Sequence, residues 1–498
     1  MIRRLLVGVL LLVVLLVAAL VVNTFRQGSK QLDVPFIAQV PVDEQAAAES
    51  LAVAIRAKTI SSHDDAALNA DQFKALHEHL EKRYPKVHAT LKREIVGELS
   101  LLYTWAGSDT SLPAIALMAH QDVVPIAPGT ESKWEAEPFG GEVKGGYVWG
   151  RGAWDDKANL IAELVAVEML IGSGFQPRRT VYLVFGADEE VGGERGARQI
   201  AALLQQRGAK IDFVVDEGLL VIEGIMPGLN KPAALVGVAE KGYLSVQLKA
   251  QATPGHSSMP PAPGTAAIAQ ISHALARLDA NPLPVAVGGI ADAMFDTLAP
   301  EFDGINRVAL TNRWLLGPVL NRQLEKGAST NALLRTTTAL TIVNAGNKEN
   351  VLPGLAEATV NFRLLPGDST QSVLDHVRRT VANERIEITP VPGASEPSRV
   401  SSTVSEGYRA IERSVRELMP GTVVAPGLML GATDSRHFEP LSKNVYRFSP
   451  VRAKPEDLAR FHGTNERISV ANLAELIRFY HRLIQTSAGP ETTQRTSP

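Results

Sequence analysis

Cysteine is absent from the 498-residue sequence. The chain therefore has no disulfide, no thiolate nucleophile and no Cys-ligated zinc, and any bound metal must be held by His, Asp and Glu. A surplus of basic charge is missing too, since the formal net charge is −3. That charge gives no reason to expect nucleic acid as a partner. The 45% hydrophobic and 21% charged content is that of a globular protein, and the length predicts two domains.

A long apolar run, Leu5 to Val22, stands near the N-terminus and follows Arg3 and Arg4. Eighteen apolar residues are about enough to cross a bilayer as a helix. The two arginines favour a cytoplasmic N-terminus, with the rest of the chain extracytoplasmic on the periplasmic, luminal or secreted side. The following residues, 23–26, are a poor cleavage site, so the sequence favours a membrane anchor. Secretion after signal cleavage is the alternative.

The order of predicted elements divides the remainder of the chain. Strands alternate with helices up to Gly242, which predicts an α/β sheet with helices on both faces. A β–β–α–β series then predicts an inserted α+β layer, within which residues 280–330 are expected to be irregular. The predicted segments are an anchor or signal (1–23), a linker (24–45), a catalytic domain in two parts (46–242 and 393–487), an inserted lid domain (243–392) and a disordered tail (488–498).

Helical periodicity over residues 45–83 includes His77-Glu78-His79. Side chains two apart on a helix project to different sides, so both imidazoles cannot reach one ion. We interpret this motif as part of a solvated helical face.

Acidic and imidazole side chains recur where predicted strands end. His120-Gln121-Asp122 follows the apolar strand Ala114–Ala119, and Asp188-Glu189-Glu190 follows Thr180–Gly186. His120 and Asp122 share one face of an extended chain, which suits a carboxylate that orients a metal-bound imidazole. Three consecutive acids at a buried strand end repel one another unless a cation or protons compensate.

Two further acidic pairs occupy similar places. Asp216-Glu217 follows the strand Phe213–Val215, and Asp155-Asp156 lies at a strand-to-helix corner, where α/β sheets usually carry their ligand sites. Each pattern alone has a simpler explanation, such as a helix cap at Asp155-Asp156 or an exposed acidic loop. The recurrence at several strand ends favours a metal site.

In chain order, these motifs together with His462 resemble those of the M20 metallopeptidases. The likeness extends from about residue 45 to 486 and is greatest to the branch of carboxypeptidase S and the N-fatty-acyl-amino-acid hydrolase/synthases. It implies a zinc-peptidase-like catalytic domain with a central mixed sheet. It also implies two Zn²⁺ ions, for which Co²⁺ or Mn²⁺ could substitute, bridged by one carboxylate.

The resemblance assigns a role to each matching residue. Asp155 matches the bridging ligand, and the other implied metal ligands are His120, Glu190, His462 and one of Asp216 and Glu217. Asp122 matches the acid behind the metal-bound histidine, Glu189 the general base, and His256 a lid histidine that approaches the reacting carbonyl. The residues implied to line the substrate side are Asn350, Arg363 and Arg436. One of the two arginines is expected to hold the free carboxylate of the substrate.

The expected activity is hydrolysis of an amide bond beside a free carboxylate, in an N-acyl amino acid or at a peptide C-terminus. The reverse condensation would use the same site. A di-metal aminopeptidase and a non-catalytic membrane-anchored binding protein are the alternatives. The membrane, through residues 5–22, is an expected partner. A second copy of the chain, bound through the lid domain, is another expected partner, because some relatives take the lid histidine from a second subunit. Residues 280–330, with Trp314, could form an acyl pocket, core packing or a dimer contact.

Overall fold

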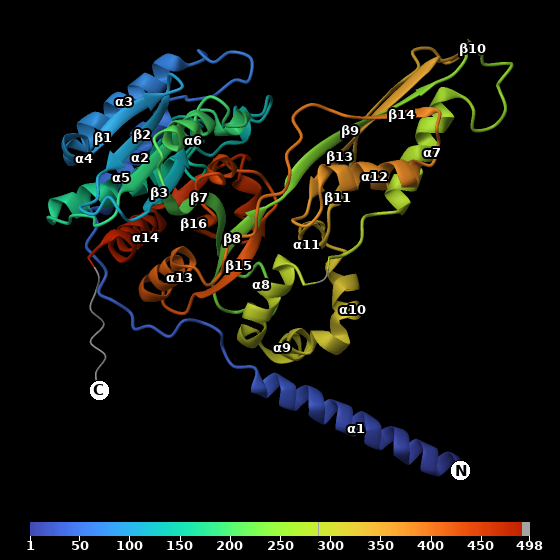
Figure 1. Ribbon diagram of the computed structural model, residues 1–498, viewed down its shortest axis with the longest axis horizontal. Coiled ribbons are helices and arrows are strands. Elements are labelled where there is room, and N and C mark those ends of the chain that lie inside the picture. The colour runs from blue at the N-terminus through green and yellow to red at the C-terminus, as the bar shows by residue number, and fades with distance from the viewer. Residues whose placement is uncertain (287, 491–498) are drawn as a thin grey trace.

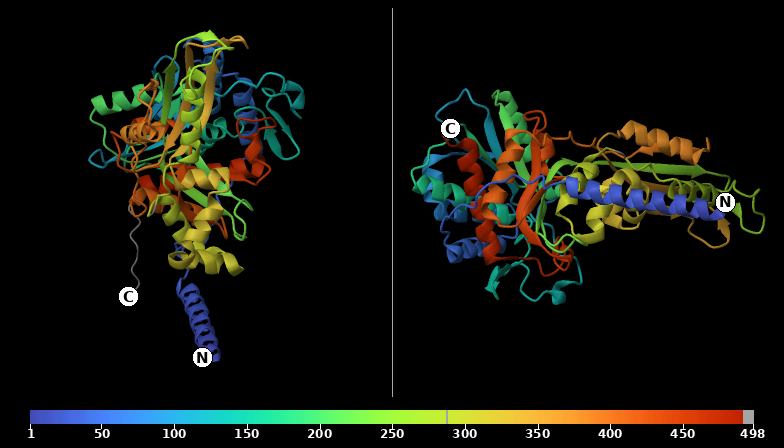
Figure 2. Two further views of the ribbon diagram at one scale, coloured as in Figure 1. Left: turned by 90° about the vertical axis from the view of Figure 1, so that its right-hand side faces the viewer. Right: turned by 90° about the horizontal axis from the view of Figure 1, so that it is seen from below.

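A computed structural model describes residues 1–286 and 288–490 (Figure 1). The chain forms a large body around one sheet and a smaller, elongated body around a second sheet (Figures 1 and 2). Helix α1 (Ile2–Arg26) projects away from both. Most of the tail predicted at 488–498 lies outside the described residues.

The large sheet is mixed, as the sequence predicts, and has eight strands in the order β1-β2-β6-β3-β7-β16-β8-β15. Strands β6, β3, β7 and β16 are mutually parallel, whereas β1 and β2 join one edge in antiparallel pairs. The strand bounds are β1 Lys92–Val96, β2 Ser100–Trp105, β3 Ala114–His120, β6 Val181–Gly186, β7 Ile211–Ile222, β8 Ala233–Glu240, β15 Val423–Met429 and β16 Val445–Ala453.

Helices cover both faces of this sheet because its strands are apolar on both faces. In β3, for example, Ile115 and Leu117 join one buried cluster, and Ala116 and Met118 join another. The first cluster packs against α2 (Glu44–Arg56), α5 (Lys157–Gly172), α13 (Glu406–Leu418) and α14 (Val470–Ala488), and the second against α6 (Ala197–Gln206). A doubly covered sheet of this kind is typical of α/β proteins.

The small sheet is fully antiparallel, in the order β11-β13-β9-β14. Its strands are β9 Gly242–Gln251, β11 Thr337–Ala345, β13 Leu355–Leu364 and β14 Ile386–Pro390. Helices α7 (Ala267–Ala280) and α12 (Thr370–Val381) bury one face. A short pair, β10 (Gly255–His256) with β12 (Val351–Leu352), forms its far tip (Figure 1).

Residues 290–330 are mostly helical, so the prediction that residues 280–330 are irregular was wrong. The helices are α8 Ile290–Leu298, α9 Gly304–Thr311, α10 Arg313–Leu324 and α11 Ala328–Leu334. Proline was the basis of that prediction, but Pro300 lies in the first turn of a 3₁₀ helix, where proline is tolerated, and Pro318 lies within α10.

Two local predictions also need correction. The segment 45–83 is two helices, α2 and α3 (Ala70–Arg83), and His77 on α3 is buried instead of solvated. Its Nε2 lies 2.7 Å from Oε1 of Gln121, so the ring packs behind the His120 strand end. Strand β7 does not end at Asp216-Glu217, because pairing with β16 resumes at Leu219 after an irregularity at Glu217-Gly218.

Helix α1 is long and apolar enough to cross a membrane, and its apolar window is not buried in the protein. A signal sequence near an N-terminus would pass the same test. Of the predicted linker, 24–45, residues 27–43 contain no helix or strand, and its two ends belong to α1 and α2. Residues 27–43 run along the large body, where the Ile37 amide donates to the Glu417 carbonyl.

Candidate active site

Three predicted metal ligands meet at one edge of the large sheet. His120 ends β3, Asp155 lies in the corner before α5, and Glu190 lies in the 3₁₀ turn Glu189–Val191 after β6. One ligand atom from each of the three lies within 4.8 Å of the others. Strands β3 and β6 are parallel neighbours and bring their carboxyl ends to the same edge, which explains how His120 and Glu190 converge. Asp155 reaches this edge because α5, which it precedes, packs on the same sheet.

His462 completes this cluster from the far end of the chain. Its Nε2 lies 2.8 Å from Oδ2 of Asp155 and 3.3 Å from Oε1 of Glu190, while Nε2 of His120 lies 2.8 Å from the other Asp155 oxygen, Oδ1. The His462 ring stacks on Phe461 at 4.5 Å. Asp155 thus presents one oxygen to each imidazole, which is the geometry of a bridging carboxylate.

Asp122 is fully buried behind His120. Nδ1 of His120 lies 3.4 Å from Oδ1 of Asp122 and 2.9 Å from the Asp122 carbonyl oxygen. The backbone amides of Glu189 and Glu190 donate to the two Asp122 carboxylate oxygens, each at 3.1 Å. One carboxylate therefore orients the imidazole and the acidic turn together.

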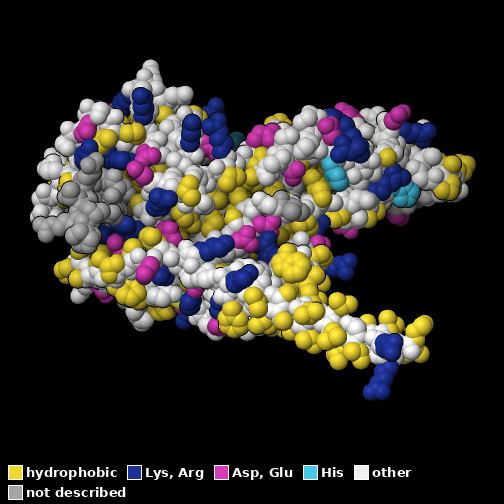
Figure 3. Space-filling view, turned by 60° about the horizontal axis from the view of Figure 1, so that its bottom comes forward, with side chains coloured by type: hydrophobic (Ala, Val, Ile, Leu, Met, Phe, Trp, Pro, Cys, Tyr) yellow, Lys and Arg dark blue, Asp and Glu magenta, His cyan; other side chains and the backbone are white. Residues whose placement is uncertain are grey.

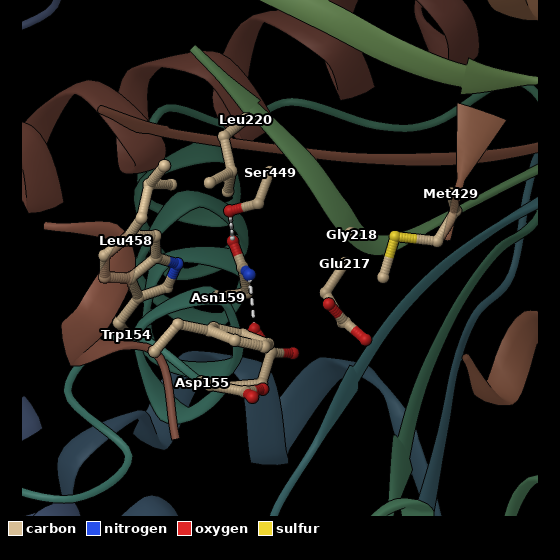
Figure 4. A pocket seen from close by; sticks show the side chains of 11 residues that line it. Trp154, Asp155, Asn159, Glu217, Gly218, Leu220, Met429, Ser449 and Leu458 are labelled. Carbon is tan, nitrogen blue, oxygen red and sulfur yellow. Dashed lines mark hydrogen bonds between the residues drawn. The ribbon is translucent and has the colours of Figure 1, made fainter. Parts of the chain in front are cut away.

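Asp216 and Glu217 differ in what their carboxylates face. Asp216 accepts backbone N–H bonds on both oxygens, from Glu217 at 2.9 Å and Ser435 at 2.8 Å. The Glu217 side chain instead lines a pocket together with Asp155, and both carboxylates are directed into that pocket (Figure 4). The pair therefore presents one carboxylate, that of Glu217, to the cluster.

This pocket has a volume of about 170 Å³ and combines the acidic cluster with an apolar wall. The wall residues are Trp154, Leu220, Met429, Leu458 and Phe461. Asn159 lies on its floor, where its amide donates to Asp156 and its carbonyl oxygen accepts from Ser449 (Figure 4).

Negative charge is crowded in the cluster. Burial, reinforced by neighbouring carboxylates, raises the pKa of Glu189 and Glu217 well above the usual range, and burial raises the pKa of Glu190 as well. Against burial, hydrogen bonds to Asp122 and Asp155 raise the pKa of His120. Oε1 of Glu190 is buried and makes no hydrogen bond among the described residues, and its contact with Nε2 of His462 at 3.3 Å is an ion pair. The cluster offers two imidazoles and several carboxylates, no sulfur ligand and an excess of negative charge. This set of ligands fits a site for divalent cations such as Zn²⁺.

The structure does not bring every predicted residue to this cluster. His256 is exposed in β10 at the tip of the small sheet, where its Nδ1 lies 2.8 Å from Oγ of Ser258. Asn350 lies beside it, since its carbonyl accepts from the Ser257 amide. The distance of this tip from the large body excludes direct contact with the cluster in this conformation of the single chain (Figure 1).

The two predicted arginines lie apart from one another. Arg363 is near the base of the small sheet, on β13, with its guanidinium 4.9 Å from the Tyr243 ring centroid. Arg436 lies on the large body, where it donates to the Gly192 carbonyl at 2.8 Å, beside the turn that carries Glu189. Only Arg436 therefore borders the acidic cluster.

Sequence reasoning missed an ion pair that holds the site together. Glu466, fully buried, accepts backbone N–H bonds on Oε1 from Gly152, Trp154 and Asp155 at 2.9, 2.9 and 3.1 Å. Its other oxygen pairs with the guanidinium of Arg151. The spacing of Glu466, four residues after His462, is the signal that could have found it.

Arg151 extends this pair to the His462 loop. Its second guanidinium nitrogen donates to the carbonyls of His462 and Gly463, each at 3.1 Å. We name the Arg151–Glu466 pair the clamp, because it ties the corner bearing Asp155 to the loop bearing His462. The relative position of two predicted metal ligands thus depends on this buried pair.

Comparisons with known proteins identify the family of the chain. Residues 116–486 match Peptidase family M20/M25/M40. The chain is 43% identical to the N-fatty-acyl-amino acid synthase/hydrolase PM20D1 of Xenopus tropicalis, covering 88% of this chain and 85% of the relative. It is 31% identical to carboxypeptidase S of Saccharomyces cerevisiae, covering 89% and 84%.

Among solved structures, the fold resembles the M20 family metallo-carboxypeptidase Sso-CP2 of Sulfolobus solfataricus, with a TM-score of 0.61 at 18% identity, covering 89% of this chain and 99% of that one. It also resembles human carnosine dipeptidase 1, with a TM-score of 0.59 at 14% identity, covering 89% and 96%. These structures confirm the predicted α/β fold. The family match and the enzyme relatives set aside the hypothesis of a non-catalytic binding protein. The chain belongs to the M20 family of peptidases and is a hydrolytic enzyme.

Proposed function

We propose that the enzyme is a di-zinc hydrolase that cleaves an amide bond beside a free carboxylate, with an N-acyl amino acid as its substrate class. The observation that carries this proposal is the placement of one Asp155 oxygen against each of two imidazoles, next to the acidic turn of Glu189 and Glu190. The names of the relatives support amide chemistry on acylated amino acids or peptide C-termini.

The proposed metal ligands are His120, Asp155, Glu190, Glu217 and His462. We choose Glu217 over Asp216 because both Asp216 oxygens already accept backbone N–H bonds. Two divalent cations at these residues would lower the pKa of a water molecule and polarise the scissile carbonyl.

Glu189 is the proposed general base. Among the described residues no hydrogen bond to its carboxylate is present, so the carboxylate is free to take a proton from water and deliver it to the leaving amine. Arg436 borders the same turn and is the proposed partner of the substrate carboxylate, with which a guanidinium can form two parallel hydrogen bonds. The apolar wall of the pocket would then receive an apolar part of the substrate.

A substrate panel tests this assignment. The purified zinc-loaded enzyme should hydrolyse N-acyl amino acids, and amidation of the free carboxylate should slow cleavage at least about tenfold, because a charge-assisted hydrogen bond is lost. Equal cleavage of amidated peptides with a free N-terminus would instead identify an aminopeptidase. The panel should include the reverse condensation, since the same site can catalyse both directions.

Metal removal is expected to make stability depend on pH. Burial raises the pKa of Asp216 to about 6, and burial with neighbouring carboxylates raises the pKa of Glu217 well above its usual range. A carboxyl with a raised folded-state pKa stabilises the fold at low pH, and this contribution is lost as the pH rises through that pKa. The melting temperature of chelated protein should therefore fall further below that of zinc-loaded protein as the pH rises from 5 to 8. A constant difference would contradict a carboxylate-rich metal site.

We propose that the small sheet, residues 243–392, is a lid domain that also pairs with a second copy. Strand β11 forms one edge of that sheet and exposes Leu340, Ile342 and Val343. An exposed apolar edge strand is a template for pairing with another chain. A second copy, or closure of the lid, could then supply His256 and Asn350 to the cluster.

Sedimentation measures this pairing. Ile342→Asp is expected to shift the protein from dimer to monomer, because a charge is placed in the apolar interface. Val143→Asp, on an exposed strand of the large body, is the matched control and should leave the dimer intact. A monomeric wild-type protein would leave lid closure as the only route for His256.

We also propose that α1 is a retained membrane anchor with the catalytic body on the extracytoplasmic side. Support comes from its length, its exposed apolar surface and the two arginines before the apolar run.

A further inference from the structure

The end of helix α1 is fixed to the body of the protein by buried polar contacts. Thr24 and Thr311 face each other through hydroxyl oxygens 2.9 Å apart, and the Asn312 amide donates to Thr24 at 3.0 Å and to the Leu20 carbonyl at 3.2 Å. The Asn23 amide donates to the Thr311 carbonyl at 2.9 Å. Asn312 is fully buried and Thr311 nearly so. Loss of α1 would break these contacts, and Thr311 and Asn312 would keep their hydrogen bonds to α9 but lose those to α1, so the contact favours retention of the helix.

This contact lies at the end of the apolar run. Leu20 belongs to the run, and Thr24 follows its last residue, Val22, by two positions, or about 3 Å along a helix axis. If α1 crosses a membrane, the residues that hold it, at the α9–α10 junction, must lie at the level of the lipid headgroups.

Helices α9 and α10 expose an apolar face at this place. The exposed fractions are 82% for Ile305, 67% for Trp314 and 65% for Val319, and α10 has no buried residue at all. Hydrophobic side chains cover α1 and also the neighbouring surface of the body (Figure 3). Exposed apolar surface of this kind marks an interaction site, and tryptophan is favoured at the water–lipid boundary.

We propose that α9 and α10 form a membrane-contact surface, which seats the body on the bilayer that α1 enters. This surface would contact the headgroup and upper acyl region of that bilayer. The bilayer is the proposed partner because this surface is continuous with α1. The buried contacts with α1 hold the apolar face of α9 and α10 at the membrane surface, where interfacial helices bind at a depth of about 5–10 Å. This inference rests on the proposed anchor and does not depend on the substrate.

The absence of cysteine allows a direct test. Single-cysteine variants of the full chain, Leu12→Cys, Val319→Cys and Val404→Cys, would each carry a nitroxide label in lipid nanodiscs. Val404 is 69% exposed on the large body and is the matched control for Val319. Power saturation with oxygen, which partitions into lipid, and with a water-soluble nickel chelate measures the surroundings of each label.

The labels at 12 and 319 should respond more to oxygen, and the label at 404 more to nickel. The label at 319 could respond to nickel as strongly as the label at 404, while the label at 12 still responds to oxygen. That result would refute the membrane-contact surface but not the membrane anchor. Shielding from both reagents with spin–spin broadening would show that a second copy covers the face, which also overturns the proposal. So would removal of α1 from the mature protein, shown by N-terminal sequencing. Hydrolase activity is a separate readout in every case.

Discussion

Glu189→Gln is expected to lower kcat by about two to four orders of magnitude, the usual contribution of a general base. The amide is isosteric with the carboxylate and cannot accept a proton at neutral pH. Asp122, which accepts from the Glu189 and Glu190 backbone amides, would still hold the turn in place. Zinc content should therefore stay near that of the wild type, so the loss should appear in kcat with metal bound.

The control for this prediction is Glu194→Gln, five residues further on and exposed, where Glu194 pairs with Arg198. This variant should keep wild-type kcat. Turnover of Glu189→Gln within a few-fold of wild type would remove the general-base role. Loss of zinc along with activity would show that Glu189 is a metal ligand, contrary to the proposal.

Glu466→Ala is expected to destabilise the fold by about 3–5 kcal/mol, because it leaves Arg151 charged and buried. It also removes the acceptor of three backbone N–H groups around the Asp155 corner. The corner and the His462 loop would then lose their common support. Zinc affinity should fall by about 10–100-fold, as is usual when the support of a ligand is removed. Thermal unfolding and zinc titration measure the two effects.

Glu466→Gln separates the two functions of the clamp. The Gln carbonyl oxygen can still accept the three N–H bonds now made by Oε1, whereas its NH₂ group cannot pair with Arg151. Zinc affinity should therefore fall less than in Glu466→Ala, although stability is still reduced. Glu456→Gln, exposed near the same loop, is the neutral control. Equal zinc affinity in all three variants would refute a positioning role for Glu466.

The sequence predicted the cluster because its members occupy places that topology brings together. His120 and Glu190 follow β3 and β6, which are parallel neighbours, so their carboxyl ends meet at one edge of the sheet. Asp155 follows β5 (Tyr147–Trp149) of a separate antiparallel sheet and reaches the same edge at the start of α5. The ambiguity between Asp216 and Glu217 could not be resolved from the sequence. It depends on an irregularity in the pairing of β7 and β16, which directs one side chain into the pocket and the other to backbone amides.

Other features were hidden because their sequence signals are weak or non-local. Strand β15 contains Pro426, which is tolerated because β15 is the last strand at its sheet edge. The burial of His77 depends on Gln121, a contact between distant segments. The position of His256 depends on how two bodies are arranged, which no periodicity encodes.

Strand β16 lies between β7 and β8 in the large sheet, although the whole small sheet separates it from them in the chain. During synthesis β7 and β8 emerge long before the strand that fills the place between them. The ribosome must therefore reach Ala453 before the large sheet can close, and the loop with His462 and Glu466 emerges later still. A nascent chain stopped earlier would carry an incomplete sheet with exposed strand edges, a state prone to aggregate.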